Sequence, residues 1–301
     1  MKRVIEELKF DDRGKEDFIF DLSKVSMKQD GRIKTPQGFF DPSDHALTQF
    51  FSRIKMPARY SKKLLTARGD LVEKQANFWL NNSDKKALFR TKHDRVRGVL
   101  SEKYSRMNNS TIIGFAKKAL DDIDADVEEF HLEDRKMRLR VTTPQEKEIE
   151  KGDPVKLGLD IENSEVGYCS LKITPIVYRL VCSNGLRLWV QGNQYTQRHI
   201  HINEKDFRKQ VAIAVHAAAK GNEEVIDLLK KSRDKTMKNF EEELREELSN
   251  KTVDRILEHA EDDSVYGIVN GITRTARDIE NDDRRVQLEE FAGNLLKKEV
   301  A

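Results

Sequence analysis

Cysteine, proline and long apolar runs are all scarce in this sequence. Its 301 residues include only two cysteines, Cys169 and Cys182, so we expect a reducing compartment and no disulfide scaffold. The apolar runs are too short for a membrane span, and the first ten residues lack the apolar stretch of a signal peptide. We therefore expect a cytoplasmic protein with no membrane partner.

The signatures of several common enzyme classes are also missing. None of the patterns GxxxxGK[ST], GxGxxG, GxSxG or HExxH occurs in the chain. This removes the simplest ATPase, dinucleotide-binding, hydrolase and zinc-protease interpretations. We expect no cofactor and favour a protein that is not an enzyme.

Charge is abundant, and it is unevenly distributed. Charged residues make up 36% of the chain, against roughly 25% in an average domain, while 37% hydrophobic residues still predict a folded core. Residues 53–106 carry 15 Lys/Arg and 5 Asp/Glu, a local balance of +10, although the whole chain is only +2. The segment is therefore a candidate surface for an anionic partner.

Aromatic residues are interleaved with the cations of this basic segment. Single-stranded nucleic acid is bound by cations that neutralise phosphates and by flat rings on which unpaired bases stack. The competing interpretation is a solvated lysine-rich face, with Phe78, Trp79 and Phe89 in the core. Both interpretations stay open at this stage. The aromatic residues of the segment are Tyr60, Phe78, Trp79, Phe89 and Tyr104.

Hydrophobic periodicity predicts an α+β fold. Residues 1–42 have the punctuation of short strands and turns, and helices are expected from Ser43, from Pro57 and over residues 70–80. Residues 87–202 predict a largely antiparallel sheet with a helix at 111–120, and residues from 204 onward predict helices. The predicted strands include 87–93 and 96–100, which flank a turn at Asp94, and 167–173, 176–181 and 186–190. We expect an α+β core over 1–203 and a helical region over 204–301 for oligomerisation or partner binding.

One predicted strand alternates between apolar and basic residues. Over residues 137–143, Met137, Leu139 and Val141 alternate with Arg138 and Arg140. Successive side chains of a strand point to opposite faces, so this strand is expected to be apolar on one face and basic on the other.

Two groups of residues are candidates for metal binding. Asp160, Glu162 and Glu165 surround a predicted turn and could hold Mg²⁺ in a nuclease, although exposed acids at a strand end have the same pattern without a metal. The spacing of Cys169, Cys182, His199 and His201 lacks the close pairs of a structural zinc site. Buried cysteines and a surface histidine pair are the preferred interpretation.

Four segments occur together in an order that resembles a known family. They are residues 98–104 (GVLSEKY), 158–167 (GLDIENSEVG), 178–186 (YRLVCSNGL) and 266–274 (YGIVNGITR). The pattern is similar to a family of uncharacterised phage- and plasmid-associated proteins and covers roughly residues 88–296. The resemblance implies mobile-element DNA metabolism, and part of the wider group resembles phage single-strand annealing proteins, which form rings or filaments. The resemblance gives no catalytic residues that could be transferred to this sequence.

These observations lead to one functional hypothesis with two alternatives. We expect a homo-oligomeric single-stranded DNA-binding and annealing protein of phage or plasmid recombination, which holds phosphates in a basic groove without nucleotide hydrolysis. The alternatives are a metal-dependent nuclease using Asp160, Glu162 and Glu165, or a mobile-element interaction protein that binds a replication or host-defence protein. The predicted nucleic-acid-binding residues are Arg90, Lys92, Arg95, Arg97, Lys103, Tyr104, Arg106, Arg138 and Arg140.

Charge reversal tests the annealing hypothesis. Replacing Arg95, Arg97 and Lys103 with Glu is expected to abolish DNA binding and to leave the thermal melt intact, because all three are taken as surface residues.

Overall fold

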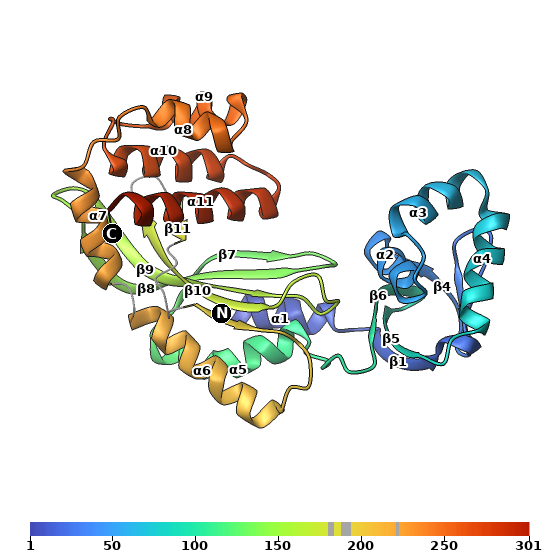
Figure 1. The fold of residues 1–301 in the computed structure, drawn as a ribbon. Helices are drawn as coiled ribbons and strands as arrows, with labels where there is room; N and C mark the ends of the chain where they lie inside the picture. Colours follow the sequence, from blue (N-terminus) through green and yellow to red (C-terminus); the bar gives the residue numbers. More distant parts are fainter. Residues whose placement is uncertain (180–183, 188–193, 221–222, 301) are drawn as a thin grey trace.

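The computed structural model describes residues 1–179, 184–187, 194–220 and 223–300, and these residues form a mixed α+β fold, as predicted (Figure 1). They contain two six-stranded sheets and eleven α-helices. The predicted strand at 186–190 and the end of that at 176–181 lie partly outside the described residues. Of the helices in these ranges, none has the length and apolarity to cross a membrane.

The first sheet belongs to an N-terminal unit. Its order is β1-β5-β6-β4-β3-β2, and all neighbours are antiparallel except β4 and β6. The predicted hairpin around Asp94 is confirmed as β5 and β6, with His93 in the left-handed region at φ 55°. The strands are β1 (Lys15–Asp21), β2 (Ser26–Met27), β3 (Ile33–Thr35), β4 (Gly38–Pro42), β5 (Lys86–Lys92) and β6 (Arg95–Ser101).

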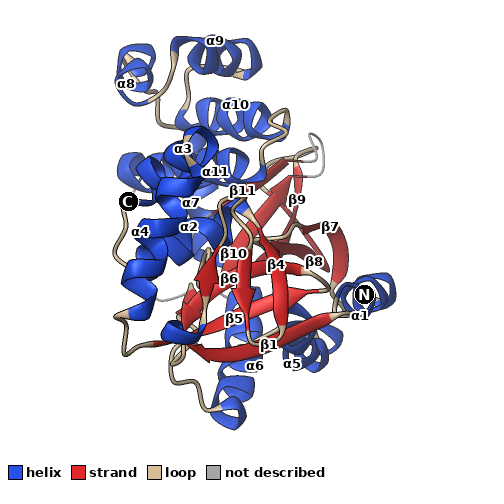
Figure 2. Ribbon diagram, turned by 90° about the vertical axis from the view of Figure 1, so that its right-hand side faces the viewer, coloured by secondary structure: helices blue, strands red, loops and turns tan. Residues whose placement is uncertain are grey.

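Three helices cover one side of this sheet (Figure 2). They are α2 (Asp44–Arg53), α3 (Ala58–Ala67) and α4 (Gly69–Asn81), close to the predicted positions. The Ser43 hydroxyl accepts a hydrogen bond from the Ala46 amide at 3.1 Å, which confirms Ser43 as the N-cap of α2. Buried side chains of α2 and α4, among them Phe50, Phe51 and Leu80, pack into the core of this unit.

The first residues are helical, which corrects the prediction of short strands there. Helix α1 (Lys2–Asp11) forms because Val4 and Leu8, one turn apart, both pack into an apolar cluster of the second unit. The short amphipathic pattern of ten residues is stabilised by this tertiary contact rather than by its own length.

The second sheet has the order β11-β10-β9-β8-β7, and β12 also pairs with β10. A single strand β10 replaces the two predicted strands 167–173 and 176–181. Pro175 fits inside it because β12 pairs with residues 171–173 and β11 with residues 176–179, so that neither of these two described strands pairs with the proline. The strands are β7 (Asp126–Leu132), β8 (Met137–Glu148), β9 (Pro154–Asn163), β10 (Leu171–Arg179), β11 (Asn184–Arg187) and β12 (Tyr195–Gln197).

Helices cover both faces of the second sheet (Figure 1). One face packs against α1, α5 (Asn109–Asp122) and α6 (Glu204–Lys220). The C-terminal helices lie over the other face. Because α6 shares an apolar cluster with β8, β9 and β10, the predicted boundary at residue 203 falls inside that cluster. The C-terminal helices are α7 (Glu223–Arg233), α8 (Phe240–Glu247), α9 (Asn250–His259), α10 (Val265–Arg277) and α11 (Asp282–Val300).

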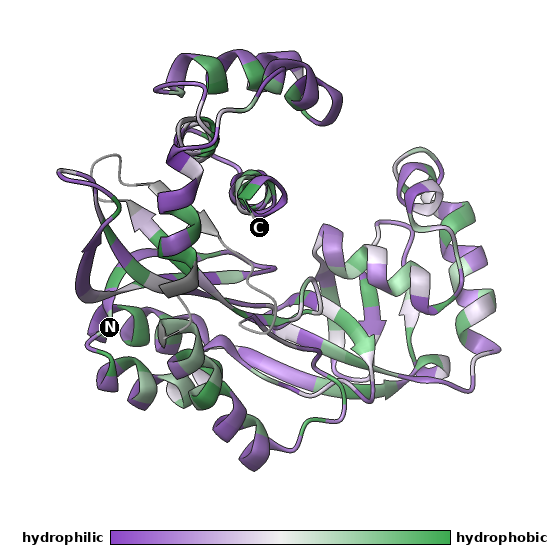
Figure 3. Cartoon of the chain, turned by 60° about the vertical axis from the view of Figure 1, so that its left-hand side comes forward, coloured by the Kyte–Doolittle hydropathy of each residue, from purple (hydrophilic) through white to green (hydrophobic). Residues whose placement is uncertain are grey.

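Because helices cover both faces of the second sheet, the alternating residues of β8 are buried on both sides. Met137, Leu139 and Val141 face α5 and α6, as the predicted apolar face requires. Arg138 and Arg140 point to the opposite face, which α11 covers. In Figure 3, α11 is seen almost end-on beside the C-terminus, and it carries both hydrophobic and hydrophilic residues around its axis.

Candidate nucleic-acid interface

The predicted binding residues do not share one exposed surface. Lys103, Arg95 and Arg106 are exposed, and Lys92 and Tyr104 are partly buried. The other four are buried, so their expected exposure is wrong. These four residues are Arg90, Arg97, Arg138 and Arg140.

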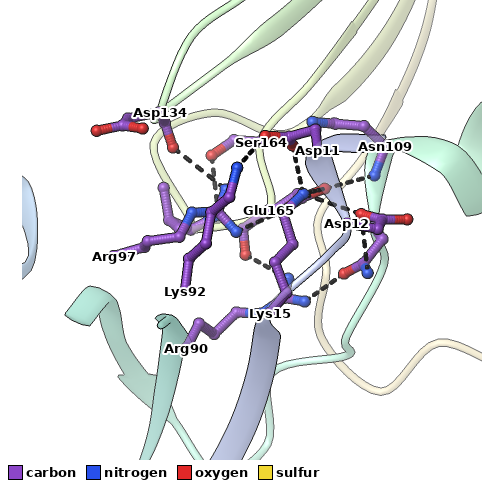
Figure 4. A network of polar contacts seen from close by, with 12 residues as sticks. Asp11, Asp12, Lys15, Arg90, Lys92, Arg97, Asn109, Asp134, Ser164 and Glu165 are labelled. Carbon is purple, nitrogen blue, oxygen red and sulfur yellow. Dashed lines mark hydrogen bonds and ion pairs between the residues drawn. The ribbon is translucent and has the colours of Figure 1, made fainter. Parts of the chain in front are cut away.

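Arg90 and Arg97 belong to a junction between the N-terminal unit and the second sheet (Figure 4), and Tyr104 joins it by a hydrogen bond to Ser164. Its centre is Glu165, which follows β9 and has a buried carboxylate. That carboxylate lies 2.9 Å from the Lys15 ammonium and 2.8 Å from the Arg97 guanidinium. It also accepts a hydrogen bond from the Asn109 amide at 2.8 Å. Burial alone would raise the pKa of Glu165, but the charges of Arg97 and Lys15 hold that pKa below its ordinary value.

Further hydrogen bonds connect the loop after β9, which contains Ser164 and Glu165, to the N-terminal unit. The Arg90 guanidinium donates to Asp17 at 2.8 Å and to the Glu165 carbonyl at 2.7 Å. The Tyr104 hydroxyl donates to the Ser164 carbonyl at 2.9 Å, and burial raises the pKa of that hydroxyl. Tyr104, predicted to stack on bases, therefore has its polar end engaged inside the protein.

Two of the segments that carry the family resemblance meet at this junction. A Cβ atom on Gly98 of β6 would lie 3.0 Å from the Val166 side chain, so glycine allows the close approach of the loop. Gly167 has a φ of +72°, and a Cβ atom there would lie 2.7 Å from Leu100. Residues 98–104 and 158–167 are thus joined by packing that only small side chains permit.

The junction also contains three carboxylates that lie close together. Asp11, Asp12 and Glu165 form the one group of potential metal ligands that the described residues bring within ligand distance. The Lys15 ammonium already lies among them, 2.5 Å from Asp11, 2.9 Å from Asp12 and 2.9 Å from Glu165. A lysine cation neutralises these charges, so the cluster is explained without a metal.

Arg138 and Arg140 form the centre of a second buried ionic cluster, which we call the sheet network. The Arg140 guanidinium is fully buried and donates to both carboxylate oxygens of Asp160 at 2.9 Å and to Glu289 of α11 at 2.6 Å. Arg138 donates to Asp282 at 2.8 Å. Burial opposes the charge of Arg140, but Asp160 and Glu289 raise its pKa well above the ordinary value. The basic face of β8 therefore holds α11 against the sheet.

The acidic residues predicted as a metal site are divided between the two clusters. Asp160 pairs with Arg140, and Glu162 lies 3.7 Å from the Lys136 ammonium in the sheet network. Glu165 belongs to the junction. The structure therefore does not bring these three carboxylates to a single site.

The remaining predicted cations differ in how they are paired. Lys92 contacts Asp11 at 2.7 Å, and the exposed Arg95 lies 3.2 Å from Asp134. Lys103 and Arg106 form no ion pair with any residue that the structure describes. These two are the members of the predicted set whose charge is open to a ligand.

The helices α3 and α4 carry exposed aromatic and basic side chains, and these include three of the five aromatic residues of the basic segment. Tyr60 is 61% exposed, Phe78 61% and Trp79 49%. The Phe78 and Trp79 rings lie edge to face with centroids 5.5 Å apart. The cations Arg59, Lys63 and Lys74 are exposed and form no ion pair within the described part of the chain. We call these six residues the α3–α4 surface.

A signal for this surface is present in the sequence. The buried positions of α4 are Val72, Ala76 and Leu80, four residues apart, which defines its inner face. Phe78 and Trp79 fall outside that spacing. The alternative that Phe78 and Trp79 belong to the core is wrong, whereas Phe89 is buried in the core, as that alternative has it.

The predicted zinc candidates also lie apart from any ligand arrangement among the described residues. His201 is exposed, but His199 is buried, which corrects the expected surface pair. Burial lowers the pKa of His199 to about 4, and its ring lies 5.5 Å from Tyr104. Burial raises the pKa of the Cys169 thiol to about 12. Cys182 lies outside the described residues.

Comparison with known proteins supports the family and leaves the function open. Residues 96–281 match the family described as "Domain of unknown function (DUF932)". Neither a curated protein nor a solved structure matches the chain. The match begins in β6 and ends before α11, so it includes the second sheet and most of its helices. It confirms the resemblance to a family of unknown function, and the chain therefore belongs to the DUF932 family.

Proposed function

We propose that this protein is a single-stranded DNA-binding and annealing protein of phage or plasmid recombination, and that the α3–α4 surface contacts the strand. Binding there needs no nucleotide hydrolysis. It requires that phosphates meet cations and that unpaired bases meet aromatic rings.

The observation that supports the proposal is the exposure of three aromatic rings on the same two helices that carry exposed cations without a described ion-pair partner. Large aromatic side chains bury much apolar area when they can, so Tyr60, Phe78 and Trp79 on one pair of helices call for an explanation. Residues 53–86 contain nine Lys/Arg and three Asp/Glu, a balance of +6. A surface that is both aromatic and cationic suits a single-stranded nucleic acid, because its bases have flat apolar faces and its phosphates are anionic.

The proposed surface differs from the groove expected over the strands. Arg90, Arg97, Arg138 and Arg140 serve internal ion pairs, and their transfer to a phosphate would break buried contacts. Residues of α3 and α4 require no such rearrangement. The surface also lies before residue 96, so it is outside the part of the chain that matches the family.

Fluorescence anisotropy with a labelled single-stranded oligonucleotide tests the proposal. Phe78→Ala and Trp79→Ala are each expected to weaken binding by about 1–3 kcal/mol, the contribution of one stacked base. Lys63→Gln and Lys74→Gln are each expected to reduce the salt dependence by about 0.7 in log–log slope, as loss of one phosphate contact does. Because these side chains are exposed, the thermal melt of each variant is expected to match the parent.

Matched control variants separate this surface from general charge and apolarity. Phe10 is 68% exposed on α1, and Lys118 is exposed on α5. Phe10→Ala and Lys118→Gln are expected to leave affinity unchanged. Equal losses in the control and test variants, or no binding at low salt, would refute the proposal.

Two further readouts follow the bound strand and the annealing step. The chain has two tryptophans, so a Trp189→Phe background makes Trp79 the sole tryptophan reporter, and its fluorescence is expected to be quenched when bases stack on it. Annealing is measured as the rate at which two complementary labelled strands pair. A Trp79→Ala variant is expected to slow it in proportion to its loss of affinity.

A further inference from the structure

A separate hollow lies between the end of α2 and the start of β5. Its volume is about 660 Å³, within the roughly 300–1,000 Å³ that is usual for small-molecule sites. Its lining includes Arg53, Lys55, Lys85 and Lys86. Two carboxylates, Asp84 and Glu102, also line it, so the cations outnumber the acids. The hollow is therefore a cationic depression within the N-terminal unit.

Most of these cations have no carboxylate partner. Arg53, Lys55 and Lys85 form no ion pair with a described residue. The Lys86 ammonium lies 3.7 Å from the Asp21 carboxylate, which is a long distance for an ion pair. Burial lowers the pKa of Arg53, because part of its guanidinium is removed from water without a compensating anion. An anionic ligand would supply that compensation.

The backbone at Lys55 gives independent support. The Met56 amide donates to the Phe51 carbonyl at 2.9 Å and the Lys55 amide to the Ser52 carbonyl at 3.2 Å, which closes the end of α2 as a Schellman motif. Lys55 occupies the left-handed position at φ 60°, where glycine is the usual residue. A side chain is therefore kept at a strained position, and it lines the hollow.

From the hollow, its unpaired cations and the strained Lys55, we propose a binding site for a phosphate group. The ligand is either the terminal phosphate of a nucleic-acid strand or a free nucleotide, because both carry the same chemistry. The site is distinct from the α3–α4 surface, so it can bind a small phosphate compound whether or not that surface binds DNA.

Calorimetric titration of the full chain with inorganic pyrophosphate at low salt tests this site. Arg53→Gln and Lys55→Gly are each expected to weaken pyrophosphate binding by about tenfold, as loss of a charged hydrogen bond does. Lys55→Gly is also expected to raise the thermal unfolding midpoint, because glycine relieves the left-handed strain. A variant that is more stable but binds less tightly cannot be explained by misfolding.

Controls and competitors decide the outcome. Lys63→Gln and Lys74→Gln, on the α3–α4 surface, are expected to leave pyrophosphate binding unchanged even where they weaken oligonucleotide binding. Tighter binding of a 5′-phosphorylated than of a 5′-hydroxyl oligonucleotide identifies a strand end as the ligand, and competition by a nucleoside triphosphate identifies a free nucleotide. Absence of pyrophosphate binding, or equal affinity in the parent and both site variants, overturns the proposal.

Discussion

The fully buried guanidinium of Arg140 provides a sharp test of how the second unit is held together. Arg140→Met keeps most of the side-chain volume but removes the charge that bridges Asp160 of β9 and Glu289 of α11. Both carboxylates are buried, and they would lose their bidentate and charge-assisted partner. Removing one member of a buried ion pair costs about 3–5 kcal/mol, a large share of the roughly 5–15 kcal/mol that stabilises a typical domain.

Urea unfolding followed by circular dichroism measures this loss. A lower midpoint is expected for Arg140→Met, together with faster proteolysis of α11, because that helix loses an ionic contact with the sheet.

Two matched variants define the control and the rescue. Arg95 is an exposed arginine with one ion pair to Asp134, and Arg95→Met is expected to cost less than about 1 kcal/mol. Adding Asp160→Leu and Glu289→Leu to Arg140→Met is expected to restore stability, because apolar side chains can replace a buried ionic cluster. A free energy of unfolding for Arg140→Met within about 1 kcal/mol of the parent would refute the reasoning.

Two further predictions follow from the burial of other residues. Arg97→Glu is expected to lower the unfolding free energy by about 3–5 kcal/mol, because it sets a second carboxylate against Glu165. Lys103→Glu, at an exposed position, is expected to change it by less than about 0.5 kcal/mol. Equal unfolding free energies for the two variants would contradict this prediction. His199 has a pKa of about 4 in the fold against an ordinary 6.5, so its contribution is complete above pH 6.5 and is lost as the pH falls toward 4, by about 3 kcal/mol in all. His199→Phe is expected to flatten the fall in unfolding free energy over that range. His216→Gln, which alters a partly exposed histidine, is expected to leave the fall unchanged. An unchanged slope in His199→Phe would contradict the assignment.

The buried position of Arg97 changes the charge-reversal experiment that the sequence alone indicates. Reversal of Arg95, Arg97 and Lys103 together is expected to lower the melt, so a loss of DNA binding in that variant would not separate contact from unfolding. Variants of the α3–α4 surface avoid this difficulty, because Phe78, Trp79 and Lys74 are exposed.

Local sequence patterns determined most elements of this protein. The Ser43 cap, the hairpin around Asp94 and the alternation of β8 depend on contacts or periods within a few residues, so they could be predicted without knowledge of the fold. The same holds for the inner face of α4, whose four-residue spacing leaves Phe78 and Trp79 outside it. Helix α1 was missed because its stability comes from a distant cluster.

Only the tertiary structure decided which charged residues reach solvent. The period of two in β8 places Arg138 and Arg140 on one face, but it contains no information about α11, which begins more than 130 residues later and covers that face. Glu165 likewise meets Lys15 and Arg97 across long stretches of chain. A run of cations has the same local pattern whether its partners are phosphates in a ligand or carboxylates from another part of the protein, and the difference is set by long-range packing.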